Sequence, residues 1–206
     1  MSALNELQNY TFVSKYARWI ESENRRETWK EAVDRVKNMM HTHYADLDIS
    51  EEVDWAYDLM FKKKILGSQR ALQFGGEPIL KRHAKIYNCT SSYCDRLRFF
   101  QECFWLLLCG SGTGFSVQKH HVSKLPNLIS VVKDKRKATK YLIEDSIEGW
   151  ADALGALLSS YFVKPSEEKF KEYKDKHIVF DYSNIRQKGA QLSSGVGKAP
   201  GSEPLQ

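Results

Sequence analysis

Apolar residues recur at helical spacing in the first third of the chain. Trp29, Val33, Val36 and Met40 lie three or four positions apart, so their side chains share one face of a predicted helix. Residues 28–31 have the form of a capping box, in which a threonine hydroxyl and a glutamate carboxylate satisfy the first free N–H groups. The sequence therefore predicts a capped helix here.

Residues 53–60 predict a second helix with one apolar face, and residues 48–51 offer a cap for its first turn. The basic run at residues 62–64 suits the negative end of the helix dipole. That run could also bind phosphate, but a solvated helix end explains it more simply. Residues 1–64 are therefore predicted to form an N-terminal helical region.

From residue 65 to residue 206, short apolar segments alternate with glycines, which indicates an α/β region. The apolar run before Gly110 predicts a buried helix that stops there, and Asp145 is predicted to cap a further helix whose apolar face includes Trp150 and Leu154. Strands are predicted at residues 115–117, 128–132 and 177–182, with a charged hairpin tip at residues 133–137 and a polar connection at residues 164–176.

The sequence LCGSGTGFSV at residues 108–117 places three glycines between an apolar helix and a strand. A P-loop needs a lysine after its last glycine, and a dinucleotide fingerprint needs the strand before the loop and the helix after it. Here the order is reversed, and the helix presents its C-terminal end, which is the wrong pole for phosphate. The local prediction is a tight helix-to-strand turn whose bare backbone can approach a ligand.

Four cysteines lie within residues 89–109 without the C-x-x-C spacing of metal and redox motifs. Cys103 and Cys109 lie on or beside the apolar helix, which favours a buried role for both. Cys89 lies among hydroxyl residues, where a reactive or redox thiol is expected, with Cys94 as its helper or as a bystander. Metal binding is not expected.

The remaining polar candidates are less specific. The histidines form no recognised catalytic or metal motif, so solvated or capping roles are expected for them. Residues 183–189 place two basic residues before a glycine at the end of a predicted strand. That arrangement fits a phosphate or carboxylate site and a simple polar loop equally well, and the sequence leaves both open.

The composition is that of a folded chain with a mildly basic net charge of +5. Because no long basic stripe is present, direct nucleic-acid binding is not expected. No segment approaches the ~20 apolar residues that span a bilayer, and the N-terminus lacks the basic and apolar regions of a signal peptide. We therefore expect a cytoplasmic protein without membrane contact.

Six motifs in chain order carry a resemblance to a known family. They are YARW (16–19), ILGSQRALQFGG (65–76), YNC (87–89), CGSGTGFSV (109–117) followed by VSKLP (122–126), EDSIEGWADAL (144–154), and FDYSNIRQKGA (180–190) with GSEPL (201–205). The ordered set resembles the N-terminal part of the large subunit of ribonucleotide reductases. It is most similar to the adenosylcobalamin-dependent (class II) type, which acts on ribonucleoside triphosphates.

The resemblance implies a fold in which the N-terminal helical region is followed by the first part of a ten-stranded α/β barrel, incomplete in this chain. It implies that Cys89 is one of two cysteines that reduce the substrate ribose by forming a disulfide. The other residues that it assigns are Ser68 and Asn88 beside the ribose and phosphate, Gly110, Gly112 and Gly114 in a close backbone turn beside the substrate, and Arg186 and Gly189 near loops that communicate with an effector nucleotide.

Other elements of the family are missing. The radical-bearing cysteine in an N-P-C-G-E setting, the second redox cysteine and the C-terminal cysteine pair are absent from this sequence. The resemblance therefore implies an enzyme only as part of a complete assembly, with a complementary chain or segment that holds most of the adenosylcobalamin, a dNTP or ATP effector, and a thioredoxin-like reductant. A split gene is the preferred explanation for the ending at Gln206, before an intein or a truncation.

Two alternatives remain open at this point. The chain fits a non-catalytic fragment that binds nucleotides or a reductase subunit, and it fits part of the large subunit of a diiron-radical (class I) reductase, which shares the barrel. The residues of the six motifs favour the cobalamin-dependent type. The sequence departs from the family's motif around Ser68. Residues 66–69 are LGSQ, whereas the family has T-P-S-G.

Overall fold

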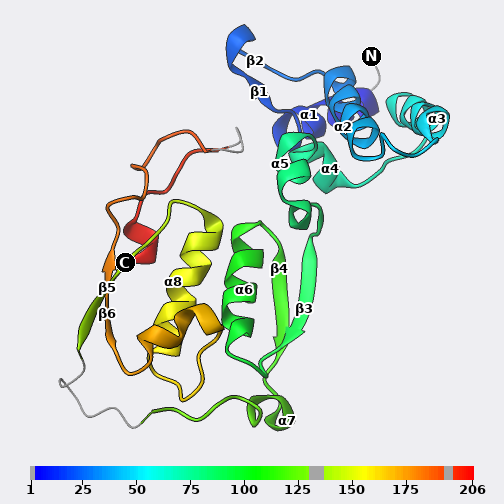
Figure 1. The fold of residues 1–206 in the computed structure, drawn as a ribbon. Coiled ribbons are helices and arrows are strands. Elements are labelled where there is room, and N and C mark those ends of the chain that lie inside the picture. The colour runs from blue at the N-terminus through cyan, green and yellow to red at the C-terminus, as the bar shows by residue number, and fades with distance from the viewer. Residues whose placement is uncertain (1–2, 130–136, 193–196) are drawn as a thin grey trace. The chain divides into compact units, whose positions relative to one another are not determined.

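The computed structural model describes residues 3–129, 137–192 and 197–206 (Figure 1). The chain forms two compact units that divide between Tyr87 and Asn88. We call them the N-terminal unit and the C-terminal unit. The division lies later than the boundary predicted after residue 64, because residues 69–81 pack with the N-terminal helices.

The N-terminal unit is mainly helical, and its second helix confirms the predicted capping box. The Thr28 side chain accepts a hydrogen bond from the Glu31 N–H, and the Glu31 carboxylate accepts one from the Thr28 N–H. The elements of the unit are α1 (Ala3–Lys15), β1 (Trp19–Ile20), η1 (Glu21–Glu23), β2 (Arg25–Arg26), α2 (Trp29–His43), α3 (Ser50–Phe61), α4 (Gln69–Phe74), α5 (Glu77–Lys81) and η2 (His83–Ile86).

The core of the N-terminal unit joins helices that are far apart in the sequence. Val33 and Val36 on α2 are buried in one cluster with Leu72 on α4 and Ile79 on α5. The start of α3 differs from the prediction. Its N-cap position is Ile49 and no side chain caps the helix, so the predicted cap at residues 48–51 is wrong.

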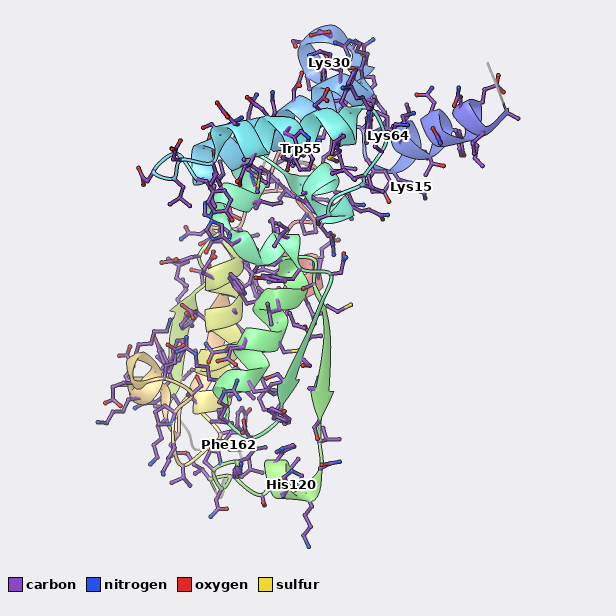
Figure 2. All side chains as sticks on the ribbon, turned by 90° about the vertical axis from the view of Figure 1, so that its right-hand side faces the viewer. Lys15, Lys30, Trp55, Lys64, His120 and Phe162 are labelled. Atoms are coloured by element: carbon purple, nitrogen blue, oxygen red, sulfur yellow. The ribbon has the colours of Figure 1, made fainter. Side chains whose placement is uncertain are left out.

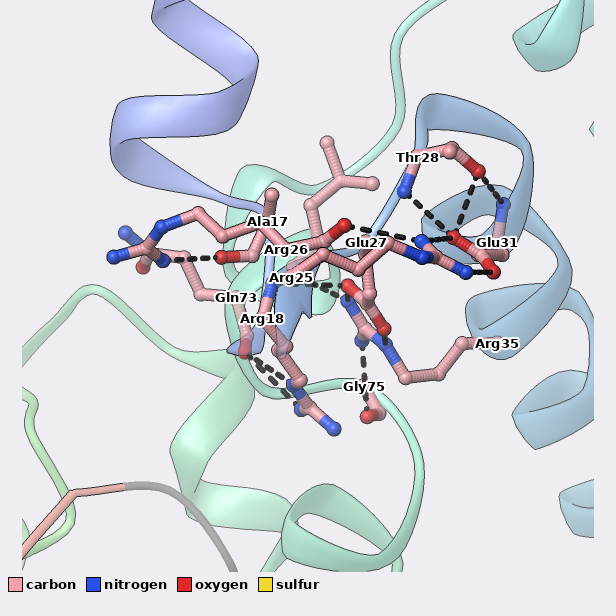
Figure 3. Close-up of polar contacts among 11 residues, drawn as sticks. Ala17, Arg18, Arg25, Arg26, Glu27, Thr28, Glu31, Arg35, Gln73 and Gly75 are labelled. Carbon is pink, nitrogen blue, oxygen red and sulfur yellow. Dashed lines mark hydrogen bonds and ion pairs between the residues drawn. The ribbon is translucent and has the colours of Figure 1, made fainter. Parts of the chain in front are cut away.

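A buried ion pair connects the segment after β2 to α2. The Glu27 side chain accepts hydrogen bonds from the Arg35 guanidinium at 2.7 and 2.9 Å (Figure 3). It also accepts one from the backbone N–H of Arg18 at 3.1 Å. Arg35 also donates to the carbonyl oxygens of Leu72 and Gly75, beside α4. Burial and the charge of Arg35 lower the pKa of Arg18 to about 10, although Glu27 opposes them. We call Arg18, Glu27 and Arg35 the Glu27 anchor.

The C-terminal unit is an α/β structure in which two parallel strand pairs flank packed helices (Figure 1). Helix α6 packs against β3, β4 and α8, and α8 also contacts β6. The elements are β3 (Cys89–Tyr93), α6 (Arg98–Leu108), β4 (Gly112–Ser116), α7 (Lys119–Val122), β5 (Ala138–Leu142), α8 (Ile147–Ser159), η3 (Glu168–Tyr173), β6 (His177–Asp181) and η4 (Glu203–Leu205).

Several predicted elements of this unit are confirmed. Helix α6 ends at Leu108, with Gly110 at a positive φ of 90° after it, and β6 occupies most of the predicted strand at residues 177–182. Of the strand predicted at residues 128–132, Leu128 forms an isolated bridge to Phe162, whereas residues 130–132 lie outside the described residues. Most of the hairpin tip predicted at residues 133–137 also lies outside them.

The start of α8 corrects one prediction. Ser146, not Asp145, caps the helix, because the Ser146 hydroxyl accepts the Gly149 N–H at 2.9 Å. Asp145 instead forms an ion pair with Arg186. Small residues such as Ala153 are the most buried in α8, whereas the larger side chains of the predicted apolar face are half-buried or exposed. The polar connection predicted at residues 164–176 contains η3.

Candidate active site

One face of strands β3 and β4 packs against α6, and on the other face the β3 residues Cys89, Ser91 and Tyr93 are exposed in the described part of the chain. Side chains alternate between the faces of a strand. On the covered face, the ring of Phe115 lies 5.0 Å from that of Phe99 on α6, measured between centroids. We call the other face the open face. It consists of three residue pairs in parallel register, which are Cys89 and Gly112, Ser91 and Gly114, and Tyr93 and Ser116.

Cys89 is the exposed thiol of the open face. It is the first residue of β3, and it lies opposite a glycine, so no neighbouring side chain on β4 stands beside it. Cys94 and Cys109 are buried and Cys103 is half-buried. Burial and the charge of Asp95 raise the pKa of the Cys94 thiol, which lowers its thiolate fraction. Cys89 is therefore the best placed of the four cysteines to meet a ligand.

The predicted glycine turn is only partly a turn. Gly110 lies between α6 and β4, but β4 begins at Gly112, so Gly112 and Gly114 lie within the strand. The Gly112 N–H donates to the Asn88 carbonyl oxygen at 2.8 Å, which fixes the backbone next to Cys89. A Cβ atom at Gly112 or Gly114 would make ordinary contacts, at 3.6 and 3.9 Å respectively. The fold therefore leaves room above both glycines.

A cluster at the far end of the open face was not predicted. His121 Nδ1 lies 3.0 Å from Ser116 Oγ, and its ring centroid lies 4.5 Å from that of Tyr93. Partial burial and the charges of His120 and Lys124 lower the pKa of His121. Figure 2 labels His120 on the short helix α7. In the sequence, this cluster is marked by two adjacent histidines after a strand, a pattern for which solvated or capping roles are expected.

The structure brings Asn88, Cys89, Gly112 and Gly114 together, with Gly110 in the adjoining turn. Ser68 lies in the N-terminal unit, where its side chain caps α4 by accepting the Ala71 N–H at 3.3 Å.

The loop after β6 holds the last two predicted site residues. The Arg186 Nε donates to Asp145 Oδ2 at 2.6 Å, and its guanidinium also donates to the Gln191 carbonyl oxygen at 3.1 Å. Gly189 has a positive φ of 89°, and its N–H donates to the Ala199 carbonyl oxygen at 2.8 Å. These contacts give Arg186 a structural role in tying the loop to the start of α8.

Within the described residues, no group of three or more His, Cys, Asp or Glu side chains is placed to hold a metal ion. Across the same ranges, each helix is too short or too polar to cross a lipid bilayer. Among the described residues, a cavity of about 520 Å³ and another of about 470 Å³ are lined by residues outside the open face.

Comparison with known proteins places these features in context. The family model of the insertion domain of B12-dependent ribonucleotide reductase matches residues 122–206, which include β5, α8 and β6. A crystal structure of B12-dependent (class II) ribonucleotide reductase superposes with a TM-score of 0.77 and 23% identity, over 95% of this chain and 35% of that one. This structural likeness shows a shared fold.

Two curated relatives are adenosylcobalamin-dependent ribonucleoside-triphosphate reductases. The protein from Euglena gracilis is 26% identical over 98% of this chain, and the protein from Lactobacillus helveticus is 26% identical over 97% of it. The chain resembles the N-terminal part of class II ribonucleotide reductases. The resemblance predicted from the motifs is thus confirmed. The chain spans 28% and 34% of the length of these two class II reductases.

Proposed function

We propose that this chain forms the first part of the barrel of a ribonucleotide reductase that converts ribonucleoside triphosphates to 2′-deoxyribonucleotides. The exposed thiol of Cys89 on the open face, beside bare glycine backbone, is the observation that carries the proposal. The named relatives support the triphosphate substrate and the adenosylcobalamin dependence. In this proposal, β3 and β4 are neighbouring strands of the ten-stranded barrel, and the open face lines its interior.

Cys89 acts as one of two reducing thiols. The C2′–OH bond of the ribose breaks and a C2′–H bond forms. The oxygen leaves as water, and two thiols supply two hydrogen atoms and become a disulfide. An external dithiol of the thioredoxin type then reduces this disulfide by thiol exchange. The second thiol comes from outside this chain, because the other three cysteines are not presented on the open face.

The glycines serve by leaving space. Without side chains at Gly112 and Gly114, the ribose can approach the β4 backbone beside Cys89. Adenosylcobalamin supplies the radical that starts the reaction when it is bound. The chain spans 28% and 34% of the two named relatives, and we assign most of the cofactor site to the rest of the enzyme. Ser68 remains a proposed substrate contact, and Arg186 and Gly189 remain proposed parts of the effector response.

The test is activity in a complete assembly. The chain is combined with a complementary segment that carries the N-P-C-G-E loop, and deoxyribonucleotide is measured with ribonucleoside triphosphate, adenosylcobalamin and a dithiol. We expect product with the wild-type chain and background levels with Cys89→Ser. Cys103→Ser is the matched control, because this half-buried thiol lies on α6, and it should retain activity. Unchanged activity in Cys89→Ser would refute the assignment.

A further inference from the structure

The larger cavity lies within the N-terminal unit and has no part in the proposed reaction. Its volume of about 520 Å³ falls within the range of small-molecule pockets, roughly 300–1,000 Å³. Its lining comes from α1, the start of α2, the connection between α3 and α4, and α4 itself. The lining residues used below are Gln8, Phe12, Trp29, Lys63, Lys64 and Leu66.

One wall of the cavity is aromatic and held in place. The ring of Phe12 meets that of Trp29 edge to face, with centroids 5.4 Å apart, and Phe12 is buried. The Trp29 Nε1–H donates to the Phe61 carbonyl oxygen at 3.0 Å, which fixes the orientation of the indole. A rigid indole and a neighbouring phenyl ring form a surface on which a planar ring can pack.

The rim of the cavity is cationic. The Lys63 ammonium lies 6.0 Å from the Trp29 ring centroid and donates to Gln8 Oε1 at 3.1 Å. Lys64 lies next to it in the connection between α3 and α4 (Figure 2). The lining contains no aspartate or glutamate. Lys62, which does not line the cavity, is instead paired with Asp58 at 2.5 Å.

The backbone supports the same arrangement. Lys63 has a φ of 57°, a left-handed conformation that is uncommon for a residue with a side chain. Its N–H donates to the Met60 carbonyl oxygen, and the next N–H donates to the Leu59 carbonyl oxygen, so the conformation belongs to the end of α3. The turn directs two successive lysines into the cavity lining while the preceding lysine stays outside.

We propose that this cavity binds a small molecule that combines a planar apolar ring with an anionic group. The ring packs against Trp29 and Phe12, and the anion is attracted by Lys63 and Lys64. The lining residues include no aspartate or glutamate, so an anionic group in the cavity meets no carboxylate of the lining. This inference is independent of the proposed function of the open face, because every residue that it uses lies in the N-terminal unit.

The test uses the full chain and two fluorescent probes of the same ring system. Anilinonaphthalene sulfonate carries the anion, and phenylnaphthylamine is its neutral counterpart. We expect the anionic probe to bind one site per chain, and the neutral probe to bind roughly tenfold more weakly. Energy transfer from tryptophan to the bound anionic probe should fall in Trp29→Phe, which keeps an aromatic ring at that position.

Charge reversal separates this site from general binding to exposed apolar surface. Lys64→Glu should weaken the binding of the anionic probe by roughly tenfold. Leu66→Asp, at another exposed position of the lining, should weaken this binding to a similar extent. Lys62→Glu is the matched control and should change the affinity by less than about twofold. Circular dichroism checks that the variants remain folded. Equal affinity for both probes, or equal effects of Lys64→Glu and Lys62→Glu, would overturn the proposal.

Discussion

The Glu27 anchor and the open face use polar groups in opposite ways. At the anchor, Glu27 is 8% exposed, and its carboxylate accepts hydrogen bonds from the Arg18 backbone N–H and the Arg35 guanidinium. On the open face, Cys89 is exposed and faces a strand that offers glycine backbone. The anchor holds elements together, whereas the open face is available to a ligand. Substitutions at the two places should therefore separate stability from activity.

The largest effect is expected at the anchor. Glu27→Ala leaves the largely buried Arg35 guanidinium without its carboxylate, with only backbone carbonyl acceptors remaining, which should lower the free energy of unfolding by about 3 kcal/mol. Urea unfolding followed by circular dichroism measures the change. The control is Asp34→Ala, which removes an exposed ion pair with Lys30 and should cost less than about 1 kcal/mol. Similar losses in both variants would contradict a special role for the anchor.

The reverse outcome is expected on the open face. Gly114→Val places a side chain where the proposed substrate approaches, and it should lower kcat/KM by about 100-fold in the complete assembly. The free energy of unfolding of the chain should not fall, because a Cβ atom there has its nearest contact at 3.9 Å and valine is favoured over glycine in strands. Full activity of a folded Gly114→Val assembly would show that substrate does not use this face.

Gly155, also in the C-terminal unit, provides a comparison with Gly114. A Cβ atom at Gly155 on α8 would overlap the side-chain amide of Gln101, which is 5% exposed and donates to Glu167. Gln101 is buried and hydrogen-bonded, so its displacement should cost more than the ~1 kcal/mol that alanine gains over glycine in a helix, and Gly155→Ala should lower the free energy of unfolding by about 1 kcal/mol. Gly114→Ala makes the same chemical change on the open face and should not destabilise the chain. Thermal melts of the two variants provide the comparison, and equal melting temperatures would contradict it.

The smallest effect is expected at the second strand pair, where β5 and β6 are joined by a side-chain contact. Lys140 donates to Asp181 at 2.6 Å and, with help from Ser183, lowers the pKa of Asp181 to about 2. In the unfolded chain this pKa is about 3.9. The ionised carboxylate therefore stabilises the fold above about pH 4, and this contribution is lost as the pH falls to about 2.

Asp181→Asn removes this titrating group. The free energy of unfolding should then depend less steeply on pH between about pH 4 and pH 2 than it does in the wild-type chain. Urea unfolding at several pH values measures the slope. An unchanged slope would mean that the contact with Lys140 does not persist in solution.

Local features of the fold were predictable from the sequence. The capping box at Thr28 and Glu31 involves residues three positions apart, and the stop of α6 at Gly110 depends on one backbone conformation. Long-range partners were not predictable. Asp145 has the right type and place for a cap, but its carboxylate is taken by Arg186, 41 positions away, and Ser146 caps the helix.

The same distinction applies to the candidate site. The family resemblance placed Cys89 and the glycines near one substrate, but only the register of β3 and β4 shows that Cys89 lies opposite Gly112. Glycine has a low strand propensity, so the sequence placed the start of β4 too late. The contacts of His121 with Ser116 and Tyr93 depend on the same strand pairing, and adjacent histidines carry no motif that would reveal them.

The pairing of β3 with β4 also has a consequence for hydrogen exchange. Each of these strands pairs with one neighbour among the described residues. In a parallel sheet, alternate N–H groups of a strand point toward opposite neighbours, so a strand with one partner protects every second amide. Deuterium uptake along β3 and β4 would therefore alternate between slow and fast residues. In the proposed barrel, further strands would pair with β3 and β4 and protect the fast set, so that assembly could be followed at individual amides.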